Sequence, residues 1–293
     1  MIDDEGVFMK RRIVSVILSC TLIAGIAYQV KVKDATAATK NLSAHFIDVG
    51  QGDAIYIKTA NGDDIVIDAG NKAKGDIVVN YLKKQKVDDI EVLISTHPDA
   101  DHVGGLDEVL NAFKVENVYA PNVSHTTQAF KDFLSAVKKQ NLKIKPVTAG
   151  VKLNLKGISA EFVGPVKTYA KSDLNNWSAV LRLVYNKNSF LFTGDAELQS
   201  EKDMINAKKL LKADVLKVGH HGAKESSSQL FLDKVQPKIA VVGVGAKNSY
   251  GHPTNETLNR FKKYKTTIYR TDKNGSVVVT SDGSKITVKT EKK

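Results

Sequence analysis

Two histidines and two aspartates fall within six positions of the chain, at His97, Asp99, Asp101 and His102. Burying such side chains without partners costs free energy, so they do not form an ordinary core segment. In an extended loop, alternate side chains share a face, so the first three can converge while His102 turns inward where a helix begins. Mixed imidazole and carboxylate ligands suit zinc or manganese. The alternative is a helix start that Asp99 or Asp101 merely caps.

A second candidate ligand is Asp195, which follows the apolar residues 190–192 and precedes a predicted helix. Open α/β sheets place functional groups at the carboxyl ends of their strands, and a carboxylate there could bridge two metal ions. A helix N-cap is the alternative role.

Two adjacent histidines, His220 and His221, end a third apolar stretch and are flanked by glycines that allow close approach of a ligand. Adjacent side chains point in opposite directions, so we expect only one of them to bind a metal. The sequence leaves open which one it is.

Alternating strand and helix patterns must position these groups. Strands are predicted at 45–49, 53–58, 63–68, 90–96, 115–119, 151–155, 158–163, 179–184, 190–193, 214–218, 239–244, 267–270, 276–280 and 285–289. Helices are predicted at 76–86, 106–113, 126–140, 197–211, 227–235 and 255–263. Strand-rich and helix-bearing segments occur twice in similar order, which predicts two packed mixed sheets with helices outside, a four-layer α/β sandwich. With no linker breaking it, we expect residues 41–293 to form one domain.

Composition restricts the chemistry. The chain has 293 residues and a single cysteine, which excludes an internal disulfide framework and cysteine-rich zinc modules. Ligands must therefore be histidines and carboxylates. The formal net charge is +11, from 43 Lys and Arg against 32 Asp and Glu. This excess predicts DNA or another anionic polymer as partner, although scattered surface lysines are the alternative. The sequence implies no protein partner.

The first 38 residues resemble an export segment. Lys10, Arg11 and Arg12 precede an apolar run at 13–28 and a small-residue site at 35–37. This pattern predicts a cleaved signal peptide, or alternatively an uncleaved membrane anchor. We therefore expect the protein to be extracellular or at the cell surface, touching membrane only through this segment.

The motifs together resemble the metallo-β-lactamase superfamily, and within it the nuclease-like domain of ComEC-type competence proteins, here as a free-standing exported form. The resemblance rests on segments 45–54, 67–70, 97–102, 176–178, 193–195, 219–222 and 250–253. It implies an αββα fold and an exported metal-dependent phosphodiesterase, or nuclease, that acts on DNA.

Two departures from the superfamily pattern concern the metal. Asp99 stands where the superfamily usually has a second histidine, which makes the site richer in oxygen and favours manganese over zinc. The superfamily also supplies a histidine between the cluster and the bridging aspartate, and here only His125 lies in that interval, in a context that does not match. We therefore expect one or two divalent ions.

The resemblance also implies roles for individual residues. A first ion would be held by His97, Asp99 and Asp195, and a second by Asp101, His102, Asp195 and His220. Catalytic roles fall to Asp101, His221 and Lys217, and substrate contacts to His252, Asn176 and Ser178. Asp68 is expected to orient a metal-binding histidine, whereas Asp48 and Asp53 are either turn acids or residues at the rim.

Two other functions compete with DNA cleavage. The same site could hydrolyse another exported phosphoester, such as teichoic acid or a phosphocholine ester. The missing histidine alternatively indicates a non-catalytic module that holds DNA or wall polymer.

Overall fold

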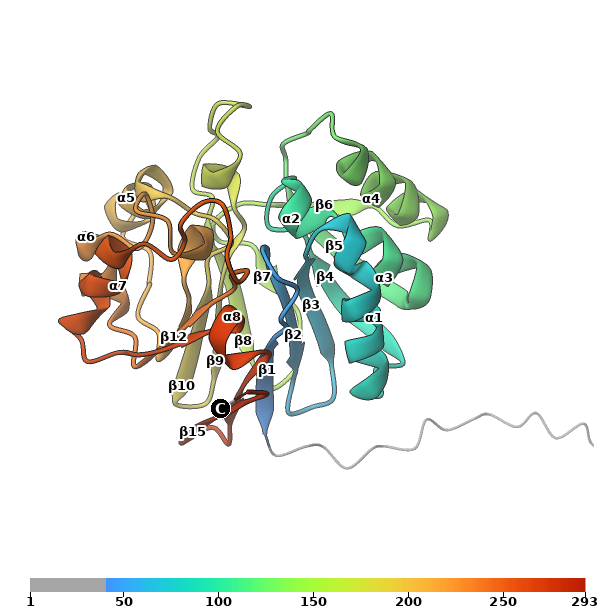
Figure 1. The fold of residues 1–293 in the computed structure, drawn as a ribbon. Helices are drawn as coiled ribbons and strands as arrows, with labels where there is room; N and C mark the ends of the chain where they lie inside the picture. Colours follow the sequence, from blue (N-terminus) through green and yellow to red (C-terminus); the bar gives the residue numbers. More distant parts are fainter. Residues whose placement is uncertain (1–40, 293) are drawn as a thin grey trace, which may run out of the picture. The chain divides into compact units, whose positions relative to one another are not determined.

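The computed structural model describes residues 41–292 (Figure 1). The predicted export segment, residues 1–38, lies outside the described residues. Within the described range, no helix has the length and apolar character needed to cross a membrane.

The strands form two mixed sheets. The first contains β1 (Leu42–Phe46), β2 (Ala54–Lys58), β3 (Asp64–Ala69), β4 (Asp89–Ile94), β5 (Lys114–Pro121), β6 (Ile144–Val147), β14 (Val277–Ser281) and β15 (Ile286–Thr290). Their order is β15-β14-β1-β2-β3-β4-β5-β6, and β3 to β6 run parallel. The carboxyl ends of these parallel strands therefore meet at one edge.

The second sheet contains β7 (Lys152–Leu153), β8 (Ser159–Gly164), β9 (Val180–Tyr185), β10 (Asn188–Phe192), β11 (Val215–Lys217), β12 (Ile239–Val242) and β13 (Thr267–Arg270). Their order is β13-β12-β11-β10-β9-β8-β7, and β10 to β13 run parallel. The segments that follow β10 and β11 carry Asp195 and the histidine pair, so parallel pairing brings them together.

Helices cover the outer face of each sheet. On the first sheet lie α1 (Gly75–Lys84), α3 (Leu106–Ala112) and α4 (Gln128–Lys139), and on the second lie α5 (Leu198–Asn206), α6 (Gln229–Val235) and α7 (Asn255–Lys262) (Figure 1). Short helices α2 (Ala100–Val103) and α8 (Thr271–Asn274), and 3₁₀ turns at Lys72–Lys74, Asn175–Trp177 and Gly219–Gly222, complete the elements. The predicted four-layer α/β sandwich is confirmed.

The inner faces of the two sheets share one apolar core. The Phe46 and Phe192 rings lie 6.1 Å apart between centroids, and those of Tyr119 and Phe162 lie 5.9 Å apart. Because each pair joins a strand of one sheet to a strand of the other, burial of these rings fixes the two sheet edges that carry the site.

Some predicted boundaries are wrong. The helix predicted at 197–211 ends at Asn206, because Lys208 takes a left-handed conformation with φ of 53° that stops the helix. The edge strand β6 was not predicted, since Pro146 interrupts its pattern.

Candidate metal centre

The candidate site lies where strand ends of both sheets meet. His97 and the helix α2, which carries His102, follow β4 in the chain. Asp195 follows β10, and His221 follows β11. All four side chains are almost fully buried. Residues more than a hundred positions apart are thus brought together by the packing of the two sheets.

A carboxylate behind His102 orients its ring. His102 Nδ1 donates to Asp68 Oδ2 at 2.8 Å, and Asp68 also accepts bonds from the Thr96 backbone N–H and hydroxyl at 2.8 and 2.6 Å. Because Nδ1 carries the proton in the neutral ring, Nε2 presents its lone pair to the site. The predicted contact between Asp68 and a histidine of the cluster is confirmed.

The backbone orients His221 in the same way. Its Nδ1 donates to the Gly243 carbonyl at 2.8 Å, which leaves Nε2 as an acceptor, 3.4 Å from His102 Nε2. His220 and His221 both have left-handed backbone angles, with φ of 45° and 50°. For residues other than glycine this conformation costs about 1–2 kcal/mol each. This costly turn directs the His221 ring into the cluster.

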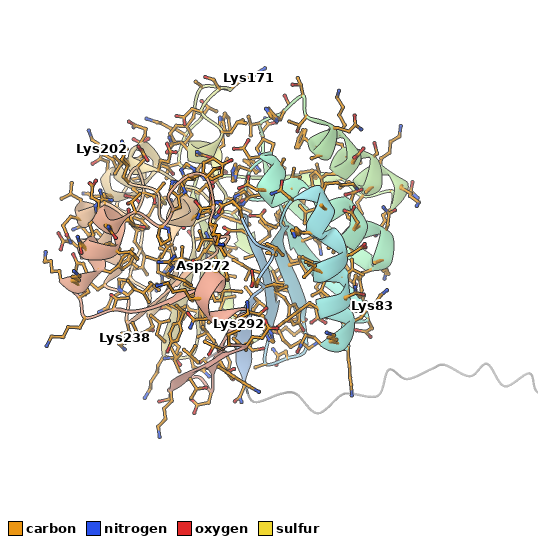
Figure 2. The ribbon with its side chains drawn as sticks, viewed as in Figure 1. Lys83, Lys171, Lys202, Lys238, Asp272 and Lys292 are labelled. Atoms are coloured by element: carbon orange, nitrogen blue, oxygen red, sulfur yellow. The ribbon has the colours of Figure 1, made fainter. Side chains whose placement is uncertain are left out.

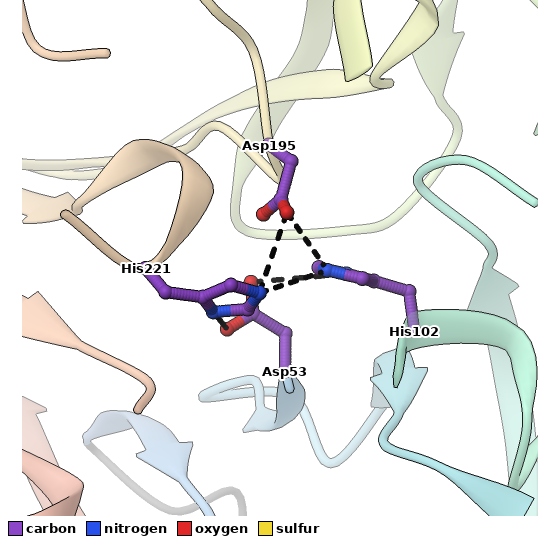
Figure 3. Close-up of side chains that lie close together, drawn as sticks. All are labelled: Asp53, His102, Asp195 and His221. Carbon is purple, nitrogen blue, oxygen red and sulfur yellow. Dashed lines mark hydrogen bonds and ion pairs between the residues drawn. The ribbon is translucent and has the colours of Figure 1, made fainter. Parts of the chain in front are cut away.

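Asp195 completes the centre of the site. Its Oδ2 lies 3.2 Å from His102 Nε2 and 3.3 Å from His221 Nε2 (Figure 3). Burial alone would raise the pKa of Asp195, but the two histidines hold it well below its usual value. Its Oδ1 is buried without a hydrogen-bond partner among the described residues.

The remaining residues of the 97–102 cluster lie beside this centre. Asp101 Oδ2 is 3.2 Å from His221 Nε2, and Asp99 Oδ2 is 3.4 Å from His97 Nε2. His97 Nε2 is buried and forms no hydrogen bond within the described chain. Both aspartates keep about a third of their side-chain surface exposed, and so they reach the mouth of the site.

This arrangement fits a divalent cation. One ligand atom each from Asp53, His102, Asp195 and His221 lie within 4.8 Å of one another. In their neutral forms the two Nε2 lone pairs would face each other at 3.4 Å beside ionised carboxylates, an unfavourable arrangement without a proton or a cation between them. Together with the fold, the donor set of nitrogen and oxygen atoms supports divalent metal binding.

Asp53 was expected only as a turn acid or rim residue, yet it is buried at the base of the cluster. Lys217 Nζ lies 2.5 Å from its Oδ2 and donates to the Val218 carbonyl at 2.8 Å. Asp53 N–H donates to the Asp101 carbonyl, and a Cβ on Gly52 would come within 2.3 Å of that carbonyl oxygen. Only glycine therefore allows this close approach.

A cavity of about 200 Å³ opens onto the cluster. Its lining residues are Gln51, Asp99, Asp101, Asn175, Asp195, His220, His221, Tyr250 and His252. His220 Nδ1 lies 2.9 Å from Glu197 Oε1, and its Nε2 is 3.9 Å from Asp195 Oδ2. His220 thus lies at the cavity wall, and His221 takes the central position expected for His220.

Asn176 and Ser178, expected to contact the substrate, and Lys217, expected to be catalytic, have other contacts. Asn176 Oδ1 accepts bonds from Glu197 N–H and Ser200 N–H at the start of α5, and Ser178 Oγ accepts one from Asp195 N–H at 3.0 Å. Lys217 is 1% exposed and is not among the residues that line the cavity. These side chains support the loops that carry the site instead of facing the cavity, whereas His252 does line it.

Sequence reasoning assigned no role to Gln51, Asn175 and Tyr250, which line the cavity, or to Glu197, which contacts His220. Asn175 donates to Glu197 Oε1 at 2.8 Å, beside the His220 contact. Gln51 and Tyr250 lie within the segments 45–54 and 250–253 that carry the resemblance, and Asn175 adjoins the segment 176–178, so these motifs could have signalled all three residues. Glu197 had no such signal, because its role depends on the turn at His220.

Comparison with known proteins agrees with this architecture. Residues 47–246 match the model of the metallo-beta-lactamase superfamily. The chain is 29% identical over 248 residues to ComE operon protein 3 of Bacillus subtilis, covering 79% of this chain and 32% of that protein. It is 32% identical over 238 residues to Recombination protein 2 of Haemophilus influenzae, covering 80% of this chain and 28% of that protein. The chain therefore spans about a third of the length of these curated relatives.

Solved structures share the fold at low sequence identity. The metallo-beta-lactamase fold protein YhfI of Bacillus subtilis superposes with a TM-score of 0.55 and 10% identity, over 82% of this chain and all of that one. CmlA, a diiron beta-hydroxylase of Streptomyces venezuelae, gives a TM-score of 0.53 and 13% identity over 78% of this chain and 52% of that one. The chain belongs to the metallo-beta-lactamase superfamily, and its homologues include competence proteins of the ComEC type.

Proposed function

We propose that this protein is a metal-dependent phosphodiesterase that cleaves DNA. The observation that carries the proposal is the convergence of His102 Nε2, His221 Nε2 and Asp195 Oδ2 within 3.4 Å of one another, beneath an open acidic cavity. Such a site suits a substrate that brings its own anionic oxygens to a cation, as a phosphodiester does.

We assign the ligands in two groups. One ion would be held by Asp101, His102, Asp195 and His221, which replaces His220 in the expected set. The other would be held by His97, Asp99 and Asp195. Asp53 is left out of both groups because Lys217 already neutralises its carboxylate.

The remaining interval of the chain offers no replacement for the missing histidine. His125 Nδ1 lies 3.1 Å from Thr127 Oγ1 at the start of α4, and His125 is not among the residues that converge at the cluster. The group around His97 therefore has a single imidazole. We infer that it binds its ion more weakly than the group around His102 does.

The chain's own residues would act in three ways. When bound, the divalent ion would stabilise the phosphate as a Lewis acid and activate water for attack. Asp68 and the Gly243 carbonyl keep both Nε2 atoms available as ligands. At the cavity wall, His220 is held by Glu197 and His252 lies beside it, so either can contact the phosphate or supply a proton to the leaving oxygen.

Homology and charge support DNA as the substrate. The similar proteins carry names that refer to competence and recombination. The excess of basic residues favours a polyanion, although Figure 2 shows Lys83, Lys171, Lys202 and Lys238 pointing outward on different sides of the domain. Electrostatic attraction between the protein and DNA would therefore be spread over the surface and sensitive to salt, instead of confined to one groove.

The test is a cleavage assay with the purified protein. Single- and double-stranded DNA are supplied to metal-free protein and then with manganese, zinc or magnesium, with Asp195→Asn as the matched control. We expect metal-dependent cleavage that the variant loses. Cleavage of bis(p-nitrophenyl) phosphate but of neither DNA would favour another phosphoester. Salt-sensitive DNA binding without cleavage, unchanged in the variant, would favour a binding module.

We further propose that this activity is located outside the cytoplasmic membrane, on the basis of the pattern in residues 10–37. Protease added to intact cells should digest the domain. Complete protection, with the domain recovered only from cytosol, would contradict this location.

A further inference from the structure

An exposed aromatic side chain stands at the rim of the metal cavity. Tyr250 follows β12 in the loop of residues 245–253 and is 67% exposed, although it lines the same cavity as Asp101 and Asp195. Its ring lies 5.7 Å from that of His252 between centroids, with the planes 26° apart. Exposed apolar side chains are common on protein surfaces, but an exposed ring at the mouth of a ligand cavity offers a flat apolar face to a bound molecule.

The aromatic pair is continuous with the wall of the site. The His252 ring lies edge-on to the His220 ring, with 5.5 Å between centroids, and His220 Nε2 is 3.9 Å from Asp195 Oδ2. A short series of rings therefore leads from the ligand cluster to solvent. A molecule held at the cluster would have its neighbouring group beside Tyr250.

One side chain holds this loop in shape. Asn248 Nδ2 donates to the Gly245 and His252 carbonyls at 3.0 and 2.7 Å, and its Oδ1 accepts from the N–H groups of Tyr250 and His252 at 3.2 and 3.0 Å. Since these bonds order the loop in advance, little conformational entropy is lost when a ligand stacks on it.

We propose that Tyr250, supported by His252, is a stacking platform for a base of single-stranded nucleic acid whose adjoining phosphodiester lies at the metal centre. The inference rests on the proposed phosphodiesterase function and narrows its substrate. A base has a flat face for Tyr250 only when it is not stacked within a duplex, so the platform favours single strands. The ring tolerates any base, which predicts weak sequence preference.

Binding to metal-free protein tests the platform without cleavage. A fluorescein-labelled single-stranded oligonucleotide is compared with an abasic oligonucleotide of equal length and charge, by fluorescence anisotropy. Stacking on an aromatic residue corresponds to about 5- to 150-fold in affinity per base. We expect the wild-type protein to bind the base-bearing strand more tightly by a factor in this range, and Tyr250→Ala to lose the preference.

Two further variants control the experiment. Tyr250→Phe keeps the ring and should keep the preference for the base-bearing strand. Leu230→Ala removes an equally exposed apolar side chain, 70% exposed on α6 and not among the cavity residues, and should also keep it. Equal binding of the two oligonucleotides by wild-type protein, or an unchanged preference in Tyr250→Ala, would overturn the platform.

The outcomes separate this inference from the proposed function. Metal-dependent cleavage of both oligonucleotides at equal rates and affinities would support the phosphodiesterase function and reject the platform. The protein would then recognise only the sugars and phosphates of the strand. A preference for the base-bearing strand that depends on Tyr250, without cleavage under any metal, would uphold the platform and reject the phosphodiesterase.

Discussion

The ammonium group of Lys217 lies 2.5 Å from Oδ2 of Asp53, and both side chains are at most 2% exposed. The pair joins the end of β11 in one sheet to the loop before β2 in the other. Burial alone would raise the pKa of Asp53, but Lys217 and His221 hold it below its usual value. Charge compensation at the base of the site therefore accounts for Lys217 without any contact to substrate.

Replacing Lys217 tests this structural role. Lys217→Met removes the ammonium partner of the buried Asp53 carboxylate, so we expect a loss of about 3–5 kcal/mol in the free energy of unfolding of the metal-free protein, measured with urea. The double variant Asp53→Asn with Lys217→Met should recover much of that loss. If Lys217→Met unfolds like the wild type but no longer cleaves its substrate, Lys217 acts on the substrate after all.

The two adjacent histidines should differ in metal binding. His221→Ala removes an Nε2 atom from the centre of the cluster, whereas His220→Ala removes a ring from the cavity wall. We expect elemental analysis to find less bound metal in His221→Ala and near wild-type metal content in His220→Ala. The opposite result would restore His220 as the ligand.

Asp68 should affect the metal through His102. In Asp68→Asn the side-chain amide can turn its NH₂ group toward His102 Nδ1, which would move the ring proton to Nε2 and block that ligand atom. We expect about a 10- to 100-fold loss of metal affinity in competition with a chelator. Asp64→Asn is the matched control, because Asp64 is also a buried carboxylate of β3 but accepts bonds from Tyr56 and Lys58. Equal losses in both variants would indicate a general effect on β3.

The sequence predicted which segments carry the site better than it predicted which way their side chains point. Strand ends followed by His or Asp could be located because the apolar runs and glycines are local signals, and these segments do meet in the structure. The choice between His220 and His221 could not be made, because it depends on two consecutive left-handed residues, a conformation that is uncommon outside glycine. The pairing of Asp53 with Lys217 spans the two sheets, so only the tertiary packing determines it.

Asn176 and Ser178 illustrate the same limit. Their polar types at the end of a loop resemble a substrate contact, yet Asn176 caps α5 and Ser178 supports the Asp195 backbone. A side chain that binds a ligand and one that accepts a hydrogen bond from a backbone N–H look alike in sequence, because the same polar residue types can do both.

A buried carboxylate outside the site should give the protein a distinct pH dependence of stability. Glu201 in α5 is 1% exposed and accepts the Ser228 N–H at the start of α6 at 2.9 Å. Burial raises the pKa of Glu201 from an ordinary 4.5 to about 7. Between these values the folded protein keeps a proton that the unfolded chain releases, so this stabilisation is complete below pH 4.5 and is lost as the pH rises to 7.

We expect Glu201→Gln to remove that contribution. On going from pH 4.5 to 7.5, the free energy of unfolding of the wild type should fall by about 3 kcal/mol relative to that of the variant, since each pKa unit corresponds to about 1.4 kcal/mol. Urea unfolding of metal-free protein across this range measures the difference. Glu116→Gln, at an exposed position of β5, controls for loss of a surface carboxylate. Parallel pH profiles for Glu201→Gln and the wild type would mean that Glu201 is ionised in the folded protein, held by the N–H groups of Ser227 and Ser228.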